Sequence, residues 1–408
     1  MWRLFFAIGV SIPITTLIFS LGDSLGQGTN SIMSRFIGSG DYESSYNALI
    51  HGIILANILW VGVVICMIFA HGILFHFNSL DSYILTFDYL MPIAIFTYIF
   101  IFNNLLAETL QAEGNSKTPT VLIIASNILN MILDPIFIFN FDLGIKGAAY
   151  ATILSSMIIF SIFLHLYSHG KTKIPLSLKY FKFRRYILIE IFKVALPNFL
   201  NDAIWCISAS FINSTLIMTM GPIGPILYSV SNKLKTLLVA PVRGYGRGLM
   251  SVTGHLFGAE KFDGLNEMYR YVLRISLITT AVVMIAFIFV RDYAFSFFSI
   301  TGMENEIFWI AVGGTVIMLC TALSMISAKM LDGFGKSMYT LAFTIFKIFF
   351  EMGLIFVLTL FITGGGSVLI GIIIAEILSA IIYYVFLKHL FNTFEEKYEE
   401  KSTVKTFN

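Results

Sequence analysis

Two polar residues one helical turn apart, inside a long apolar stretch, are the first candidates for chemistry in this chain. Asn130 and Asp134 are four residues apart, so they share one face of a helix. Pro135 has no backbone N–H to donate, which frees the carbonyl of Met131 one turn earlier. A carboxylate, an amide oxygen and a free carbonyl are ligands that a hard cation prefers. The pattern indicates ion or proton binding, while a structural role in which Asn130 bonds Asp134 and holds a kink stays open.

The next apolar stretch carries a residue that can complete such a site. Gly144, Gly147 and Ala148 are small residues of the kind that let a neighbouring membrane helix approach closely. Ala148 and Thr152 share a helical face, and the Thr152 hydroxyl can add an oxygen to a site on the preceding stretch. Taken alone this signal is weak, because a threonine in a membrane helix usually bonds its own backbone.

Charged residues also lie within the apolar stretches of the second half. Asp202, Lys347, Glu351 and Glu376 are candidates for a coupling role or for the lining of a polar cavity. An isolated charge in lipid costs ~2.5 to 3.5 kcal/mol on insertion scales, so a compensating use or partner is expected. Lys347 and Glu351 are four residues apart, and an ion pair along one helix explains them as well as a coupling role does.

The composition places the chain in a membrane and excludes several functions. It is 57% hydrophobic and 12% charged with a mean hydropathy of +0.84, whereas a soluble domain has roughly 25% charged residues. A net charge of +2 gives no reason to expect a nucleic-acid partner. Cys66, Cys206 and Cys320 are far apart and form no metal or disulfide motif. No ATP motif is present, so we expect transport to run on an ion gradient, with Na⁺ or H⁺ as the coupling ion and no other cofactor. A membrane-embedded transferase would need acidic or histidine clusters in a loop at the membrane surface, and the sequence has none, so we expect no enzyme.

Apolar stretches long enough to cross a bilayer recur along the chain, which predicts an all-α polytopic membrane protein. We count eleven such helices. They cover residues 3–25, 46–75, 84–112, 118–140, 145–168, 187–218, 224–254, 267–290, 305–332, 338–362 and 366–390.

The sequence also repeats itself, which indicates a transporter built from two related halves. Glycines near the end of the first stretch recur 220 residues later, and Gly114 recurs as Gly335. The repeated copies are six stretches apart, so both face the same way and the repeat is parallel. The first set is Gly26, Gly28 and Gly38, matched by Gly246, Gly248 and Gly258.

The repeat predicts a six-plus-six plan of which eleven helices are present. The partner of stretch 187–218 would fall before Met1, so we expect the first helix of the plan to be missing from the sequence. The predicted parts are an N-terminal lobe of five helices (1–168), a basic cytoplasmic linker (169–186), a C-terminal lobe of six helices (187–392) and a cytoplasmic tail (393–408).

The basic residues between the stretches predict the orientation. When the connections are assigned alternately to two sides, one side holds fourteen Lys and Arg residues and the other holds Arg3, Lys146 and Arg291. This asymmetry puts the carboxyl terminus in the cytoplasm. The fourteen are Arg35, Lys117, Lys171, Lys173, Lys179, Lys182, Arg184, Arg185, Lys261, Lys336, Lys388, Lys397, Lys401 and Lys405.

These motifs resemble those of the multidrug and toxin extrusion (MATE) family of secondary transporters, especially its prokaryotic and archaeal members. The similar segments are 26–41, 111–119, 130–138 and 144–152. The resemblance implies two six-helix lobes around a central cavity, which export amphipathic and often cationic compounds in exchange for Na⁺ or H⁺. It also implies a cation site formed by Asn130, Asp134, the backbone of Ala148, Thr152 and an aspartate on a first helix that has no counterpart here.

We therefore predict a monomeric, cation-coupled exporter of small organic molecules in a prokaryotic cell membrane, which works by alternating access. Two alternatives stay open: a lipid-linked oligosaccharide flippase of the same superfamily, and a truncated remnant that does not transport. A flippase would favour a basic cavity. The basic residues that would support it by facing the centre are Lys233, Lys235, Arg243 and Arg247.

Overall fold

The protein is described here from a computed structural model, and its chain is helical throughout. The structure describes residues 2–77, 80–170, 172–176, 181–298, 300–362 and 364–406. Within these ranges it contains helices, turns and short connections and no strand. The predicted all-α class is confirmed. Two basic residues of the predicted linker, Lys171 and Lys179, lie outside the described residues.

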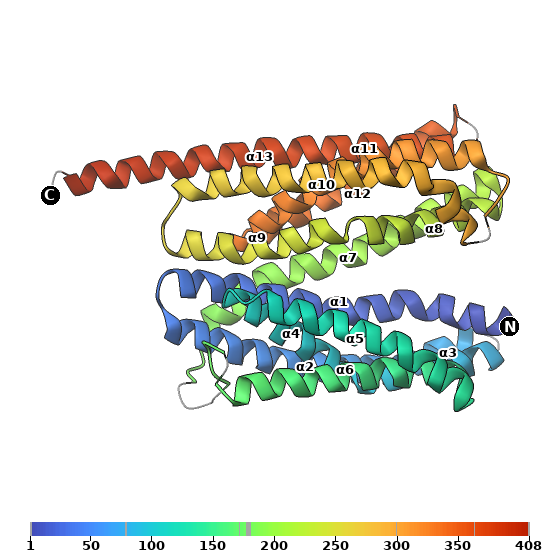
Figure 1. The fold of residues 1–408 in the computed structure, drawn as a ribbon, viewed down its shortest axis with the longest axis horizontal. Helices are drawn as coiled ribbons and strands as arrows, with labels where there is room; N and C mark the ends of the chain where they lie inside the picture. Colours follow the sequence, from blue (N-terminus) through green and yellow to red (C-terminus); the bar gives the residue numbers. More distant parts are fainter. Residues whose placement is uncertain are drawn as a thin grey trace. The chain divides into compact units, whose positions relative to one another are not determined.

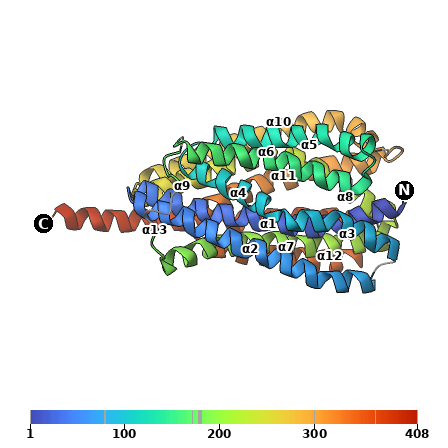
Figure 2. The same cartoon turned by 90° about the horizontal axis from the view of Figure 1, so that it is seen from below.

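Each of the eleven predicted stretches coincides with one helix or with two consecutive helices. The helices of each half of the chain run roughly alongside one another (Figures 1 and 2). The helices are α1 (Trp2–Gly38), α2 (Tyr42–Phe77), α3 (Leu80–Ile95), α4 (Thr97–Ala112), α5 (Lys117–Pro135), the π-helix η1 (Ile136–Asn140), α6 (Gly144–Ser168), α7 (Arg185–Met220), α8 (Ile223–Leu238), α9 (Ala240–Gly258), α10 (Asp263–Ser296), α11 (Glu304–Gly333), α12 (Ser337–Thr359) and α13 (Gly366–Thr406).

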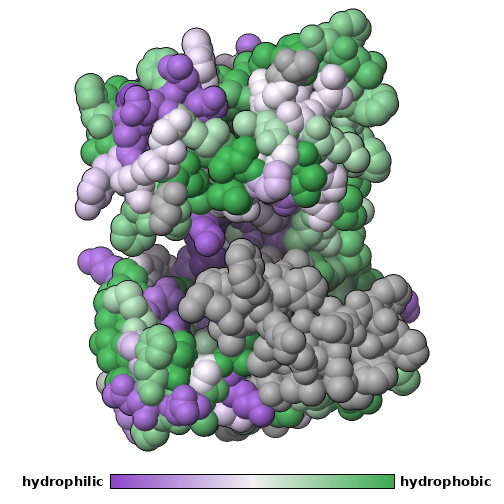
Figure 3. All heavy atoms as spheres, turned by 90° about the vertical axis from the view of Figure 1, so that its right-hand side faces the viewer, coloured by the Kyte–Doolittle hydropathy of each residue, from purple (hydrophilic) through white to green (hydrophobic). Residues whose placement is uncertain are grey.

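Most of these helices suit a bilayer by length and composition. Among the described residues, eight are long and apolar enough to span a membrane, or nine if the pair 89–95 and 97–112, bent by 53°, is one span. On α5, Val121, Ile124 and Met131 are more than half exposed, as expected of a surface that contacts lipid. Figure 3 looks along the helices at one of their ends, where hydrophilic and hydrophobic residues are mixed in the coloured part of the surface.

The stretch predicted at 224–254 folds as two helices, α8 and α9, which meet at Val239. It does not pass the same test of length and apolar character. Its basic residues explain this, because two lysines on α8 and two arginines on α9 lower the hydropathy of the segment. This part of the second half is therefore the most polar of the predicted spans in its amino-acid composition.

The chain forms two compact units, residues 1–202 and 203–408. Each has its own hydrophobic core, built in the first unit mainly from α1, α2 and α4 and in the second mainly from α9, α10, α11 and α13. The division falls within α7, so the first half of this helix belongs to the first unit and the second half to the second unit.

The duplication predicted from the glycines is visible as repeated packing. A Cβ on Gly26 of α1 would lie 2.9 Å from Cγ of Glu108 on α4, and one on Gly246 of α9 would lie 3.1 Å from Cγ of Lys329 on α11. The two pairs occupy matching positions in the two halves. At Gly26 the backbone carbonyl oxygen of Asn104 also lies 3.0 Å from the Cβ position, so only glycine fits there. At Gly246 a Cβ would require the flexible side chain of Lys329 to shift.

The turns that end the repeated helices also match. Gly114 after α4 has a φ of +88°, and Gly335 after α11 has a φ of +73°, a region that favours glycine. In both turns the next residue donates its N–H to the carbonyl five residues earlier, at 3.0 Å and 2.8 Å, which ends the helix and satisfies its last carbonyls. The repeat in the sequence is therefore a repeat of helix ends as well as of helices.

The predicted linker folds back on the first unit. Lys182 Nζ lies 2.9 Å and Arg184 Nη2 3.0 Å from the same oxygen of Glu43, at the start of α2. Lys173 Nζ donates to the backbone carbonyl of Glu113 at 3.0 Å. Several of the basic charges that predicted orientation thus also join the linker to the ends of α2 and α4.

Glu113, directly after α4, anchors the linker through its carboxylate. Its Oε2 accepts the N–H of Lys173 at 2.8 Å, and its Oε1 accepts the N–H of Ile174 at 3.2 Å. The side chain is buried, and this burial raises the pKa of the Glu113 carboxyl above its ordinary value, although the two N–H groups and the Lys173 ammonium act in the opposite direction. The linker is therefore joined to the end of α4 through a buried carboxyl group.

Candidate functional site

The four residues predicted for an ion site lie together in the first unit. Asn130 Nδ2, on α5, donates to Asp134 Oδ1 at 3.2 Å and to Thr152 Oγ1, on α6, at 3.3 Å. The Thr152 hydroxyl in turn donates to the carbonyl of Ala148 at 2.9 Å. All four residues are half-buried. One chain of hydrogen bonds therefore links a carboxylate, an amide, a hydroxyl and a backbone carbonyl across two helices.

The backbone around this group is irregular on one side and closely packed on the other. α5 ends at Pro135, and the chain continues as the π-helix η1, in which Phe141 N–H donates to the Ile136 carbonyl at 3.0 Å. A Cβ on Gly147 of α6 would lie 2.7 Å from both the carbonyl carbon and oxygen of Phe137. Gly147 therefore lets α6 approach the π-helix, which brings Thr152 within reach of Asn130.

The chemistry of this group suits a small hard cation or a proton. A carboxylate, a hydroxyl, a carbonyl and, after rotation of its amide, Asn130 offer four oxygen atoms of the kind that bind such cations. The Asn130 amide nitrogen now lies between Asp134 and Thr152, where its two hydrogens satisfy both oxygens. In the part of the chain that the structure describes, no three His, Cys, Asp or Glu side chains are grouped to hold a metal ion.

A second group of charges lies in the second unit and contains three of the other four predicted residues. Lys347 Nζ, on α12, donates to Glu376 Oε1, on α13, at 2.6 Å. The same Glu376 oxygen lies 3.8 Å from Nζ of Lys235 on α8. Glu351 is one turn from Lys347 and interacts electrostatically with both lysines and with Glu376. The direct partner of Lys347 is thus on a neighbouring helix rather than one turn along its own helix.

These four residues, Lys235, Lys347, Glu351 and Glu376, are called the charged cluster below. The two carboxylates are buried, with residue exposures of 5% for Glu351 and 4% for Glu376. The lysine side chains are more accessible, at 22% for Lys347 and 34% for Lys235. The cluster therefore has a buried acidic side and a partly exposed basic side. The remaining predicted residue, Asp202, is an exposed residue of α7 in the first unit.

One buried polar contact was not predicted from the sequence. Asn30 Nδ2, on α1, donates to Glu108 Oε2, on α4, at 2.8 Å, and both residues are essentially inaccessible. An acidic residue within the predicted stretch 84–112 was the available signal. The structure adds that Glu108 also packs against Gly26, a glycine of the repeat.

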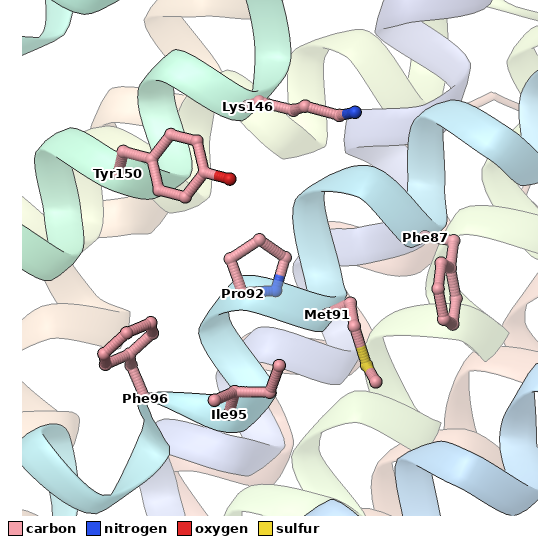
Figure 4. Close-up of a pocket in the computed structure, with 7 residues that line it drawn as sticks. All are labelled: Phe87, Met91, Pro92, Ile95, Phe96, Lys146 and Tyr150. Atoms are coloured by element: carbon pink, nitrogen blue, oxygen red, sulfur yellow. The ribbon is translucent and has the colours of Figure 1, made fainter.

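A small pocket of about 280 Å³ opens between α3 and α6. Figure 4 shows Lys146 and Tyr150 extending from α6, with the apolar residues and Pro92 on the facing segment. Tyr150 is two residues from Thr152, so the two side chains do not share a helical face, and the pocket contains none of the predicted site residues. It is lined by Phe87, Met91, Pro92, Ile95, Phe96, Lys146 and Tyr150.

Comparison with known families identifies the chain. The family model MatE matches residues 7–136 and 204–357, which is well over half of the sequence and includes both halves of the repeat. The chain belongs to the MatE family. The resemblance predicted from the motifs is therefore confirmed, and the protein is a MATE transporter.

Relatives of this MATE transporter include multidrug export proteins. It is similar to multidrug export protein MepA of Staphylococcus saprophyticus, with 26% identity over 389 residues that cover 92% of this chain and 83% of that protein. It is also similar to MepA of Staphylococcus aureus, with 25% identity over 265 residues that cover 62% of this chain and 57% of that protein.

Solved structures share its fold. A crystal structure of MATE in complex with MaL6 matches with a TM-score of 0.92 and 26% identity, covering 96% of this chain and 89% of that chain. A crystal structure of MATE in the bent conformation matches with a TM-score of 0.90 and 27% identity, and the match covers 97% of this chain and 89% of that chain. The structure of a MOP superfamily transporter from Pyrococcus furiosus matches with a TM-score of 0.91 and 26% identity, and the match covers 96% of this chain and 88% of that chain. That transporter is described as having a binding pocket of reverse polarity.

Proposed function

We propose that this MATE transporter exports amphipathic, often cationic, organic compounds across the cell membrane in exchange for Na⁺ or H⁺, with its carboxyl terminus in the cytoplasm. The observation that carries the coupling part of this proposal is the hydrogen-bonded chain from Asp134 through Asn130 to Thr152. The names of the MepA relatives, which are multidrug export proteins, support the choice of cargo.

The geometry suggests how an ion or proton would act on the helices. Asn130 is the bridge between α5 and α6, and it uses one amide group for both Asp134 and Thr152. A cation or proton at Asp134 competes for the same carboxylate oxygen, so it weakens that bridge. The weakening occurs directly before Pro135 and η1, where the regular hydrogen bonding of the helix is already interrupted. Bending there is the step that we propose couples ion exchange to release of the compound.

The bent and straight forms among the similar structures fit this idea. The MATE proteins described in a straight and in a bent conformation both match this chain, with TM-scores of 0.92 and 0.90. Two conformations of one fold are what alternating access needs, provided that the ion binds them with different affinity. We propose that Asp134 supplies this difference here.

Asp134→Asn tests the proposal directly. The variant keeps the size of the side chain and removes the charge, so gradient-driven efflux of a cationic dye from vesicles should fall to the level of vesicles without the protein. Asp142→Asn is the matched control, because Asp142 is an exposed residue in the turn after η1. Its φ of +53° is tolerated by asparagine. Running the assay with either a Na⁺ or an H⁺ gradient separates the two coupling ions. Full efflux by Asp134→Asn would remove Asp134 from the mechanism.

The flippase alternative has less support. It requires an excess of positive charge to hold a lipid-linked phosphate, whereas the charged cluster pairs two lysines with two glutamates. Of the four basic residues that would favour a flippase, Lys235 therefore has an acidic partner in the second unit, at 3.8 Å from Glu376, and Arg243 adds a like charge in its surroundings.

A further inference from the structure

The pocket between α3 and α6 lies in the first unit, at the bend between α3 and α4. The axis of the chain changes direction there by 53°. Pro92, which has no N–H to donate, lines the pocket within the last turn of α3. The carbonyl of Ile95 at the bend accepts the indole N–H of Trp60, on α2, at 2.9 Å. The hollow of about 280 Å³ beside this bend is lined mainly by apolar side chains.

The pocket opens on a different face of these helices from the candidate ion site. On α6, Tyr150 lines the pocket and Thr152 belongs to the ion site. Residues two apart in a helix point about 200° away from each other. On α3, Phe87 lines the pocket, whereas Tyr89 interacts electrostatically with Asp134. The same two-residue offset on both helices separates a ligand of this pocket from ion coupling.

Lys146 and Tyr150 form the polar end of the pocket. Both are exposed and one helical turn apart, and Figure 4 shows both side chains reaching from α6 toward α3. Lys146 is two residues from the start of α6, at the edge of a 25-residue apolar span. It is also one of the three basic residues predicted for the side opposite the carboxyl terminus. An ammonium and a phenol at this depth are two hydrogen-bond donors for a phosphate group.

An apolar stripe continues from this polar end along α6. Tyr150, Leu154 and Met157 follow one another at helical spacing, and each is more than a third exposed. The rise from Lys146 to Met157 is roughly 16 Å. One leaflet contributes about 15 Å of hydrocarbon to a bilayer. A positive end with an apolar track one leaflet deep has the dimensions of a phospholipid.

We propose that this pocket binds an anionic phospholipid of the leaflet that faces away from the carboxyl terminus. Lys146 and Tyr150 hold its phosphate, and one acyl chain lies along Leu154 and Met157. A zwitterionic phospholipid carries its own ammonium group beside the phosphate, and this group repels Lys146, so the anionic lipid is preferred. The inference goes beyond the proposed export function and does not depend on the compound that is exported.

Quenching of tryptophan fluorescence by brominated lipids tests the inference. Trp60 is a natural reporter, because its indole is bonded to the pocket residue Ile95. Phenylalanine replaces the other three tryptophans, Trp2, Trp205 and Trp309. The full-length chain is placed in phosphatidylcholine vesicles that contain equal small fractions of brominated phosphatidylglycerol or brominated phosphatidylcholine. We expect phosphatidylglycerol to bind about fivefold more tightly, the effect of one basic residue on an anionic headgroup.

Three variants show whether Lys146 causes this preference. Lys146→Gln should bring the ratio of the two binding constants to about one, whereas Lys146→Arg keeps the charge and should keep the preference. Lys117→Gln is the matched control, because Lys117 is an exposed lysine at the start of α5 and does not line the pocket. The ratio is measured on one protein at a time, so a loss of folding that affects both lipids equally cancels.

Native mass spectrometry of the protein with all four tryptophans is the second measurement. Fewer phosphatidylglycerol molecules should stay bound to Lys146→Gln than to the wild type. No preference for phosphatidylglycerol in the wild type, or a preference that survives Lys146→Gln, overturns the inference. Equal losses in Lys146→Gln and Lys117→Gln indicate attraction to surface charge in general and overturn it too. Each of these results leaves the proposed export function standing.

Discussion

Replacing Gly147 with alanine should loosen the contact between α6 and the π-helix that follows Asp134. The added Cβ would lie 2.7 Å from the carbonyl carbon and oxygen of Phe137. These are backbone atoms, so no side chain can rotate to make room. Normal carbon contacts are about 3.5 Å or longer, and the overlap is therefore about 0.8 Å. If α6 moves away by that distance, the 3.3 Å bond from Asn130 to Thr152 is stretched to about 4 Å and is lost.

The expected cost follows from this overlap. Inserting a methyl group into a well-packed position costs typically 1 to 3 kcal/mol. For a domain of about 200 residues, such as the first unit, a loss of ~2 kcal/mol in the free energy of unfolding lowers Tm by roughly 4 to 8 °C. The assay is thermal unfolding of the purified protein in detergent, followed by tryptophan fluorescence, together with vesicle efflux, which should also fall because Asn130 no longer bridges the two helices.

Gly62→Ala is the matched control for Gly147→Ala. Gly62 lies within α2 of the same unit, and a Cβ there meets no atom within 4 Å. Alanine should therefore leave Tm unchanged or slightly raised, since glycine is the poorer helix former by about 1 kcal/mol. A Gly147→Ala protein whose Tm and efflux both match the wild type would refute the idea that this close approach positions Thr152.

Two other predictions concern charges. Lys347→Gln leaves the buried Glu376 without its hydrogen-bonded ammonium, so thermal unfolding should show a loss of stability of about 3 kcal/mol or more. The double variant that combines Lys347→Met with Glu376→Met should recover most of this loss. A double variant no more stable than Lys347→Gln would contradict the pairing. The pKa of Glu113 is raised by burial above its ordinary value of 4.5, so its contribution to stability is complete below about pH 4.5 and is lost as the pH rises through the folded-state pKa. Glu113→Gln should therefore flatten the fall of Tm between acidic and neutral pH, and an unchanged slope would show that other groups cause it.

The candidate ion site was largely accessible from the sequence because its contacts are local. Asn130 and Asp134 are one turn apart, and Ala148 and Thr152 are one turn apart, so helical periodicity alone places each pair on one face. The bond between the pairs, from Asn130 to Thr152, joins consecutive helices that are connected by a short turn. The use of this group for ion coupling stays a prediction.

The charged cluster shows where sequence reasoning stops. The four-residue spacing of Lys347 and Glu351 was as consistent with an ion pair along one helix as with a coupling role, but the ammonium of Lys347 lies 2.6 Å from Glu376 on α13. Lys235 reaches the same carboxylate from α8. Spacing predicts which residues share a face of one helix, whereas partners on other helices depend on how those helices pack.

By itself the sequence determined the helical class, the positions of the eleven apolar stretches and the duplication, since each follows from local hydropathy or from repeated glycines. Only the tertiary structure decided what surrounds each of those glycines: a Cβ on Gly28 would lie 2.6 Å from the carbonyl oxygen of Ile191, whereas one on its counterpart Gly248 would meet no atom within 4 Å. At Gly26 and Gly246 a side chain from another helix passes over the backbone, an acid in one half and a base in the other. The physical reason is that hydropathy and turn geometry are properties of neighbouring residues, while close packing and ion pairing join residues far apart in the chain.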